Sequence, residues 1–199
     1  LPYFTNDMPR FVAQELTNLN KASPPVKGLI LDLRNNARGS LEQAVRTASL
    51  FLGKQKVVAT RGRQSGAEQT YQGAESEVLR SLPLVVLVDQ GTARAAEIVA
   101  GALQYHRRGI LLGDKTFGLC GLTQVMPLQD GSALMMTVAY CYTPGGQKIS
   151  NDGLKPDIEA QKPPEEDTKS LTSPTPNPDN DPWVKQAVEV LKSGRAPSS

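Results

Sequence analysis

Apolar residues recur along the chain at two spacings that distinguish helices from strands. Over 8–20 and again over 41–52 they recur three or four residues apart, which predicts two amphipathic helices. Short, almost uninterrupted apolar runs at 28–33, 84–88 and 110–113 are typical of strands buried in a parallel sheet. Strands that alternate with helices in this way predict an α/β domain with a core of mostly parallel strands.

Two further strand-like runs, 122–128 and 133–139, flank Asp130-Gly131 and predict an antiparallel hairpin. If these two residues centre the turn, Cys120 and Cys141 face each other across the ladder, within reach of a disulfide. A disulfide would imply an oxidising compartment. The other interpretation is two independent cysteines, each buried as a small apolar side chain.

Composition divides the chain into three parts. Residues 1–160 carry the α/β pattern and form the core domain. Residues 161–181 are rich in Pro and Asp, contain too few apolar residues to pack, and are typical of a linker. Asp181 as the N-cap and Pro182 at the first helical position begin a closing helix over 182–193.

The balance of charge argues against nucleic acid as a partner. The chain has 22 Lys and Arg against 20 Asp and Glu, which gives a net charge of +2 and no strong field. No apolar run is long enough to span a bilayer. We expect neither a metal nor a cofactor.

The segment from Leu87 to Val99 predicts an apolar strand, a sharp Gly turn and the start of a helix of small residues. Many hydrolases present their nucleophile at such an elbow, where backbone N–H groups at the helix N-terminus hold an oxyanion. Between Gly91 and Ile98, however, there is no Ser or Cys, and Arg94 stands in the turn. The sequence thus predicts the framework of a hydrolase site without its reactive atom.

Several blocks of sequence stand in a fixed order over residues 1–159. They are Gly28–Asn36 with Gly39, Gly91–Gln104, Gly113–Gly118, Asp130–Leu134 with Thr137–Ala139, and Tyr142–Pro144 leading to Gly153–Asp157. In this order they resemble the C-terminal processing peptidases, or tail-specific proteases, of serine peptidase family S41. The resemblance implies a crotonase- or ClpP-like α/β core, cleavage near the C-termini of proteins, and a periplasmic or otherwise extracytoplasmic place in a bacterium. It covers the protease core, without the PDZ domain that usually precedes it.

The family uses a Ser/Lys dyad, and the resemblance places this dyad on residues that cannot perform its chemistry. Arg94 stands at the nucleophile position and Leu119 at the general-base position. The resemblance assigns the oxyanion hole to Gly39 and to the backbone N–H of Ala95, and Arg38 replaces a second Gly of that loop. Arg stays protonated and Leu accepts no proton, so no catalytic group is intact.

Four other residues are candidate replacements for the missing groups, and a structural role is the simpler interpretation for each. They are Thr92 within the elbow, Lys115 before the base position, Cys120 on the opposite strand face from Leu119, and His106 near a helix C-terminus, where a cation is favoured.

Arg38 and Arg94 fall at or just before helix N-termini, where a positive charge is disfavoured unless an anion shares the site. One hypothesis is that they clamp a carboxylate, such as a peptide C-terminus. The other, which we prefer at this point, is that both side chains extend into solvent and block the cleft.

Three functions follow from these observations. The favoured one is a noncatalytic S41-like protein that binds protein C-termini, associates with an active relative or forms a homo-oligomer, because nucleophile, base and a Gly are lost together. The second is an active serine-type endopeptidase that cleaves near protein C-termini with an unrecognised residue. The third is a crotonase-type enzyme acting on a small acyl ligand, which rests on fold analogy alone.

Overall fold

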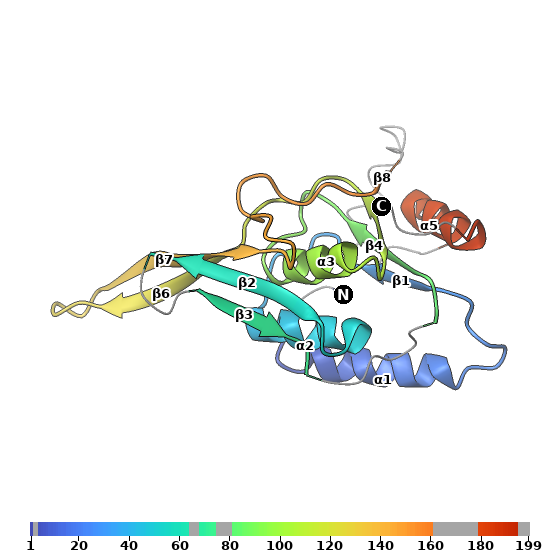
Figure 1. The fold of residues 1–199 in the computed structure, drawn as a ribbon, viewed down its shortest axis with the longest axis horizontal. Coiled ribbons are helices and arrows are strands. Elements are labelled where there is room, and N and C mark those ends of the chain that lie inside the picture. The colour runs from blue at the N-terminus through green and yellow to red at the C-terminus, as the bar shows by residue number, and fades with distance from the viewer. Residues whose placement is uncertain (2–3, 64–67, 75–80, 161–178, 195–199) are drawn as a thin grey trace.

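A computed structural model describes residues 1, 4–63, 68–74, 81–160 and 179–194. Within these residues the strands form two four-stranded sheets (Figure 1). The first is parallel, and its strands in spatial order are β1 (Leu29–Asp32), β4 (Leu84–Val88), β5 (Ile110–Gly113) and β8 (Ile158–Glu159). Most of the expected linker, residues 161–178, lies outside the described residues.

The second sheet is antiparallel. Its strands in spatial order are β3 (Gln69–Gln72), β2 (Lys56–Gly62), β7 (Ala133–Tyr142) and β6 (Gly121–Pro127). The predicted α/β fold is confirmed, and the predicted hairpin is β6–β7. This hairpin is one half of a larger sheet, because β2 pairs with β7 as well as with β3.

Helices cover both faces of the parallel sheet. On one face α2 (Leu41–Leu52) and α3 (Ala95–Tyr105) pack together, and α1 (Met8–Asn20) lies on α2. The other face is covered by α5 (Pro182–Lys192), as Figure 1 shows. The central strand β4 is therefore buried on both sides, which explains its unbroken apolar run.

Local signals set the ends of two of these helices. The Ser40 side chain accepts a hydrogen bond from the Gln43 backbone N–H, and the Gln43 side chain accepts one from the Ser40 N–H, so that a capping box begins α2. Asp181 caps α5 as expected, and the helix packs Trp183 and Ala187 against β4 and β5. The closing helix thus belongs to the core.

The turn of the β6–β7 hairpin differs from the expected one. Met126 pairs with Leu134, which is one residue away from the register of a ladder centred on Asp130-Gly131. Gly131 has a φ of 83° and donates its N–H to the Leu128 carbonyl, so the turn takes one residue more than a two-residue loop. The expected register is therefore wrong near the tip.

Closer to the core, a β-bulge restores the expected register, and Cys120 and Cys141 form a disulfide. The register shifts between Leu122 and Thr123. Beyond this shift Cys120 and Cys141 lie opposite each other, with Cα atoms 5.4 Å apart, and are joined by a disulfide. The pairing of the two cysteines is confirmed, although the turn that predicted it has another geometry.

Candidate active site

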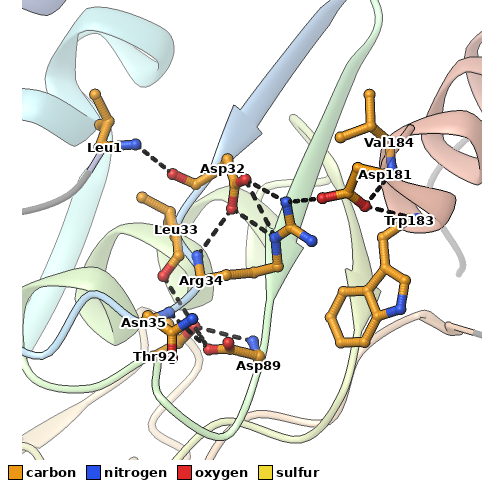
Figure 2. A network of polar contacts seen from close by, with 10 residues as sticks. All are labelled: Leu1, Asp32, Leu33, Arg34, Asn35, Asp89, Thr92, Asp181, Trp183 and Val184. Carbon is orange, nitrogen blue, oxygen red and sulfur yellow. Dashed lines mark hydrogen bonds and ion pairs between the residues drawn. The ribbon is translucent and has the colours of Figure 1, made fainter. Parts of the chain in front are cut away.

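The elbow between β4 and α3 is built around the Asp89 side chain. Asp89 Oδ1 accepts a hydrogen bond from the backbone N–H of Asn35 at 2.9 Å (Figure 2). It also accepts one from the backbone N–H of Gly91 at 3.0 Å. The buried Thr92 hydroxyl lies 3.0 Å from both Asp89 Oδ1 and the Leu33 carbonyl oxygen. These contacts fasten the elbow to the loop that follows β1, and they engage the Thr92 hydroxyl in a structural role.

Arg94 occupies the apex of the elbow and is the N-cap residue of α3. Its backbone has φ 56° and ψ −116°, a region that strains any residue with a Cβ. Strained strand-to-helix turns of this kind present the nucleophile of many hydrolases. Here the exposed side chain at the apex is a guanidinium.

Glu97 joins the first turn of α3 to the loop that precedes β6. Its fully buried carboxylate accepts hydrogen bonds from Thr116 Oγ1 and from the backbone N–H groups of Gly118, Leu119 and Arg94, over 2.5 to 3.2 Å. Burial raises the pKa of Glu97, and these donors oppose the rise because they stabilise the charged form. The carboxylate thus holds the elbow and the loop in one fixed arrangement.

The structure brings the predicted nucleophile and base positions together. The Arg94 backbone N–H donates to the Leu119 carbonyl at 3.0 Å. The Phe117 N–H donates to the Thr92 carbonyl at 3.0 Å, so the same loop contacts the elbow twice. Phe117 and Leu119 are 61% and 42% exposed, so this loop presents apolar side chains beside the elbow.

The two predicted oxyanion positions are also neighbours. A Cβ placed on Gly39 would lie 3.0 Å from the Ala95 Cβ. The backbone of residue 39 has a φ of 121°, which requires Gly. The Ala93 N–H donates to the Asn36 carbonyl at 2.9 Å, which ties this loop to the elbow. Arg38 lies on the same loop and is exposed.

Two of the other candidate replacements, Cys120 and His106, are held elsewhere. Cys120 is in the disulfide with Cys141. His106 lies at the far end of α3, about 16 Å from the elbow at 1.5 Å per residue, and its Nε2 is 2.7 Å from the Lys56 carbonyl oxygen. The Lys115 side chain is exposed. The contacts of Thr92, Cys120 and His106 favour structural roles for these three residues.

A buried ionic network that the sequence pattern did not reveal lies beside the elbow (Figure 2). Arg34 donates from Nη2 to Asp32 Oδ2 at 2.6 Å and to Asp181 Oδ2 at 2.7 Å. The Arg34 side chain is 10% exposed and that of Asp181 is 2% exposed. The guanidinium carbon of Arg34 also lies 5.5 Å from the centre of the Trp183 ring. This network connects α5 to the loop that carries Asn35.

Electrostatics favour the charged form of both partners in this network. Burial opposes the charge of Arg34, but the two carboxylates outweigh it and raise its pKa. Burial also opposes ionisation of Asp181, but Arg34 and the N–H groups of Trp183 and Val184 hold its pKa below the ordinary value. The sequence indicated Asp181 only as an N-cap, because its partner lies 147 residues away.

The chain is similar in sequence to curated C-terminal processing proteases. A profile of peptidase family S41 matches residues 1–160. The carboxy-terminal-processing protease of Bartonella bacilliformis is 40% identical over 138 residues, which are 69% of this chain and 32% of that protein. The carboxyl-terminal-processing protease of a Synechocystis species is 37% identical over 196 residues, which are 98% of this chain and 44% of that protein. The chain spans less than half the length of these relatives.

Solved structures agree with this placement. The photosystem II D1 C-terminal processing protease matches with a TM-score of 0.73 and 35% identity, covering 80% of this chain and 40% of that chain. Mature CPAF in complex with lactacystin matches with a TM-score of 0.70 over 94% of this chain and 48% of that chain, and at 15% identity it shows the shared fold alone. The chain therefore belongs to peptidase family S41.

Proposed function

We propose that this chain is a noncatalytic S41 protein that binds the C-termini of proteins or peptides at its elbow. The observation that carries the proposal is Arg94 at the strained apex, where a hydrolase presents its nucleophile. A guanidinium stays protonated and does not attack a carbonyl, and the neighbouring Leu119 side chain accepts no proton. The framework of a hydrolase site is in place around groups without hydrolytic chemistry.

A carboxylate fits the altered site better than a scissile peptide does. The first N–H groups of α3 lack partners within the helix and carry the positive end of its dipole. Arg94 adds a full positive charge at this end, and a guanidinium can bind a carboxylate through two parallel hydrogen bonds. Arg38, on the neighbouring oxyanion loop, adds a second cation. A peptide C-terminus supplies the matching anion.

An active peptidase would need another nucleophile near the elbow. Among the described candidates, the Thr92 hydroxyl is buried and bonded and Cys120 is oxidised. No observation favours a small acyl ligand beyond the shared fold. Binding without cleavage is therefore the function that the geometry supports best.

The proposal includes an extracytoplasmic location in a bacterium and association with an active relative or a second copy. The disulfide supports this location, because such bonds persist in oxidising compartments. Among the described helices, none has both the length and the apolar character required to cross a bilayer.

Binding of matched peptides tests this function. A peptide with a free C-terminal carboxylate and the same peptide with a C-terminal amide are titrated into the chain and followed by calorimetry. We expect the acid to bind about tenfold more tightly or better, as is ordinary for a charge-assisted hydrogen-bond pair. Arg94→Gln should remove this preference, whereas Arg10→Gln, which removes an exposed Arg on α1, should retain it. Equal binding of acid and amide by the unmodified chain contradicts the proposal.

A further inference from the structure

Among the described residues, strand β6 is the edge of the antiparallel sheet, and none of them pairs with the outward row of its backbone groups. The Cys141 N–H donates to the Cys120 carbonyl, and the Leu128 N–H donates to the Ser132 carbonyl. Even-numbered residues of β6 therefore direct their backbone groups toward β7. Because these directions alternate along a strand, the odd-numbered residues direct theirs outward. Gly121, Thr123 and Val125 thus form an open edge.

This open edge begins at the elbow. Leu119 precedes β6 and, like the odd-numbered residues of that strand, directs its backbone groups outward. Its carbonyl accepts the Arg94 N–H at 3.0 Å. The elbow therefore bonds to the first outward-facing position of the edge. The unpaired outward-facing positions follow it along β6, away from the elbow. The row ends at Pro127, which has no N–H to offer.

The hairpin around this edge is apolar, exposed and almost uncharged. Figure 1 shows β6 and β7 projecting from the body of the molecule. Between Leu119 and Tyr142 the only charged residue is Asp130, in the turn at the tip. Both faces expose large apolar side chains, namely Val125 (61% exposed), Met126 (45%), Leu134 (48%), Met135 (68%) and Met136 (45%). Such a surface fits a partner whose own side chains are uncharged.

We propose that the free edge of β6 receives the C-terminal segment of a target protein as an added strand. The segment runs antiparallel to β6, so that its last residue meets the elbow and its carboxylate meets Arg94. This inference rests on the proposed function and assigns the place where the target lies. Backbone hydrogen bonds to Gly121, Thr123 and Val125 hold the segment, which spans about five residues or about 17 Å.

Charge and side-chain pattern define the targets that this surface accepts. Arg94 stands at the inner end of the edge, where the carboxylate arrives, and Lys148 lies against Tyr140, the partner of Gly121, at the same end. From Leu119 to Pro127 the edge itself contains no charged residue. Side chains of an added strand alternate between the two faces of the hairpin and meet Val, Met and Leu on both. The preferred target is an extended, uncharged, apolar tail with a free carboxylate.

N-methyl peptides test this arrangement without altering the protein. A short Val- and Leu-rich peptide with a free carboxylate is methylated at one backbone nitrogen at a time. Methylation of an N–H that faces β6 should weaken binding about tenfold, and methylation of the intervening residues should change it less than about threefold. An effect that alternates along the peptide is the signature of strand addition.

A pair of variants at Val125 tests the protein side. Val125→Pro removes an outward N–H and mimics the native Pro127 two residues later, so the ladder with β7 is retained. Val125→Thr keeps the N–H and the β-branched shape. We expect about tenfold weaker binding for Val125→Pro and a change below about threefold for Val125→Thr.

The outcomes separate this inference from the function on which it rests. One outcome is that Arg94→Gln abolishes the preference for the acid, while neither N-methylation nor Val125→Pro weakens binding. This outcome leaves the proposed function standing and overturns the assignment to β6. Loss of acid selectivity in the unmodified chain overturns both. Another outcome is that the chain forms a dimer, which Val125→Pro dissociates and the peptide does not disrupt. This outcome would place a second copy on the β6 edge and would also overturn the assignment.

Discussion

Arg94 carries its side chain on a backbone conformation that costs energy for any residue with a Cβ. A φ of 56° with a ψ of −116° is a region that Gly occupies readily and other residues rarely. The surrounding bonds hold it there, from the Arg94 N–H to Leu119 and Glu97 and from Ala93 to Asn36. Strain of this kind persists where the neighbouring structure determines the backbone, which is the condition expected at a binding site.

Replacing Arg94 by Gly should stabilise the chain by about 1 kcal/mol, because the strain of the Cβ is removed. Arg94→Ala is the matched control: it deletes the same guanidinium but keeps the Cβ, and its free energy of unfolding should stay near that of the unmodified chain. Urea unfolding of the three proteins measures the difference. If the Gly variant is no more stable than the Ala variant, the apex is not strained.

Glu97 should contribute more to stability than its place in a helix suggests. An acidic residue in the first turn of α3 looks from sequence like a partner of the helix dipole. In the structure it accepts three hydrogen bonds from residues 116–119 and one from the Arg94 N–H, and Glu97→Gln turns an amide NH2 toward these donors. We expect a loss of about 2 kcal/mol. Glu42→Gln, in the exposed first turn of α2, should change stability by less than about 0.5 kcal/mol in the same urea titration.

At the scale of elements, local patterns predicted most of the fold and missed what depends on pairing. The helices over 8–20 and 41–52 follow from apolar periodicity, because each buries one face. The extra turn residue at Gly131 and the bulge beyond Leu122 could not be predicted, since an inserted residue leaves the composition of a strand unchanged. The predicted pairing of Cys120 with Cys141 is nevertheless correct, because the one-residue shift at the turn and the one at the bulge compensate.

The disulfide should stabilise the base of the hairpin from which the β6 edge starts. It closes a loop with a sequence separation of 21 residues, which corresponds to about 3 kcal/mol in the chain-entropy account. Cys120→Ser with Cys141→Ser should lower the free energy of unfolding by roughly this amount and speed amide exchange in β6 and β7. An unfolding midpoint that reductant leaves unchanged would contradict this.

At the scale of the whole molecule, an ion pair joins the start of α5 to the loop that follows β1. Arg34 and Asp181 are separated by 147 residues, and between them lie the segment 161–178 and most of the fold. Sequence spacing predicts contacts between near neighbours, so this pairing could not be predicted, whereas the N-cap role of Asp181 could. The elbow itself was predictable because its strand, turn and helix are contiguous.

This ion pair predicts how stability depends on pH. The pKa of Asp181 is lowered in the folded chain. Its stabilising contribution is therefore complete above the unfolded pKa of about 3.9 and is lost as the pH falls through the lower folded pKa. Asp181→Asn should cost about 2 kcal/mol at pH 7, and this difference should shrink below pH of about 4.

The fluorescence of Trp183, the only Trp in the chain, reports the undocking of α5 in this experiment. Asp152→Asn, at an exposed position, is the control and should follow the unmodified chain at every pH. A difference between the Asp181 variant and the unmodified chain that stays constant down to pH of about 2 would show that the Asp181 charge does not hold the helix.

The most direct test of the account is whether the unmodified chain cleaves peptide bonds. A protein substrate with an apolar C-terminal tail is incubated with the chain, and its products are followed by mass spectrometry. We expect no product above the blank, and we expect cleavage only after Arg94→Ser is combined with Leu119→Lys, because the elbow already holds these two positions together. Cleavage by the unmodified chain that increases with its concentration would contradict the central claim that the site binds without catalysis.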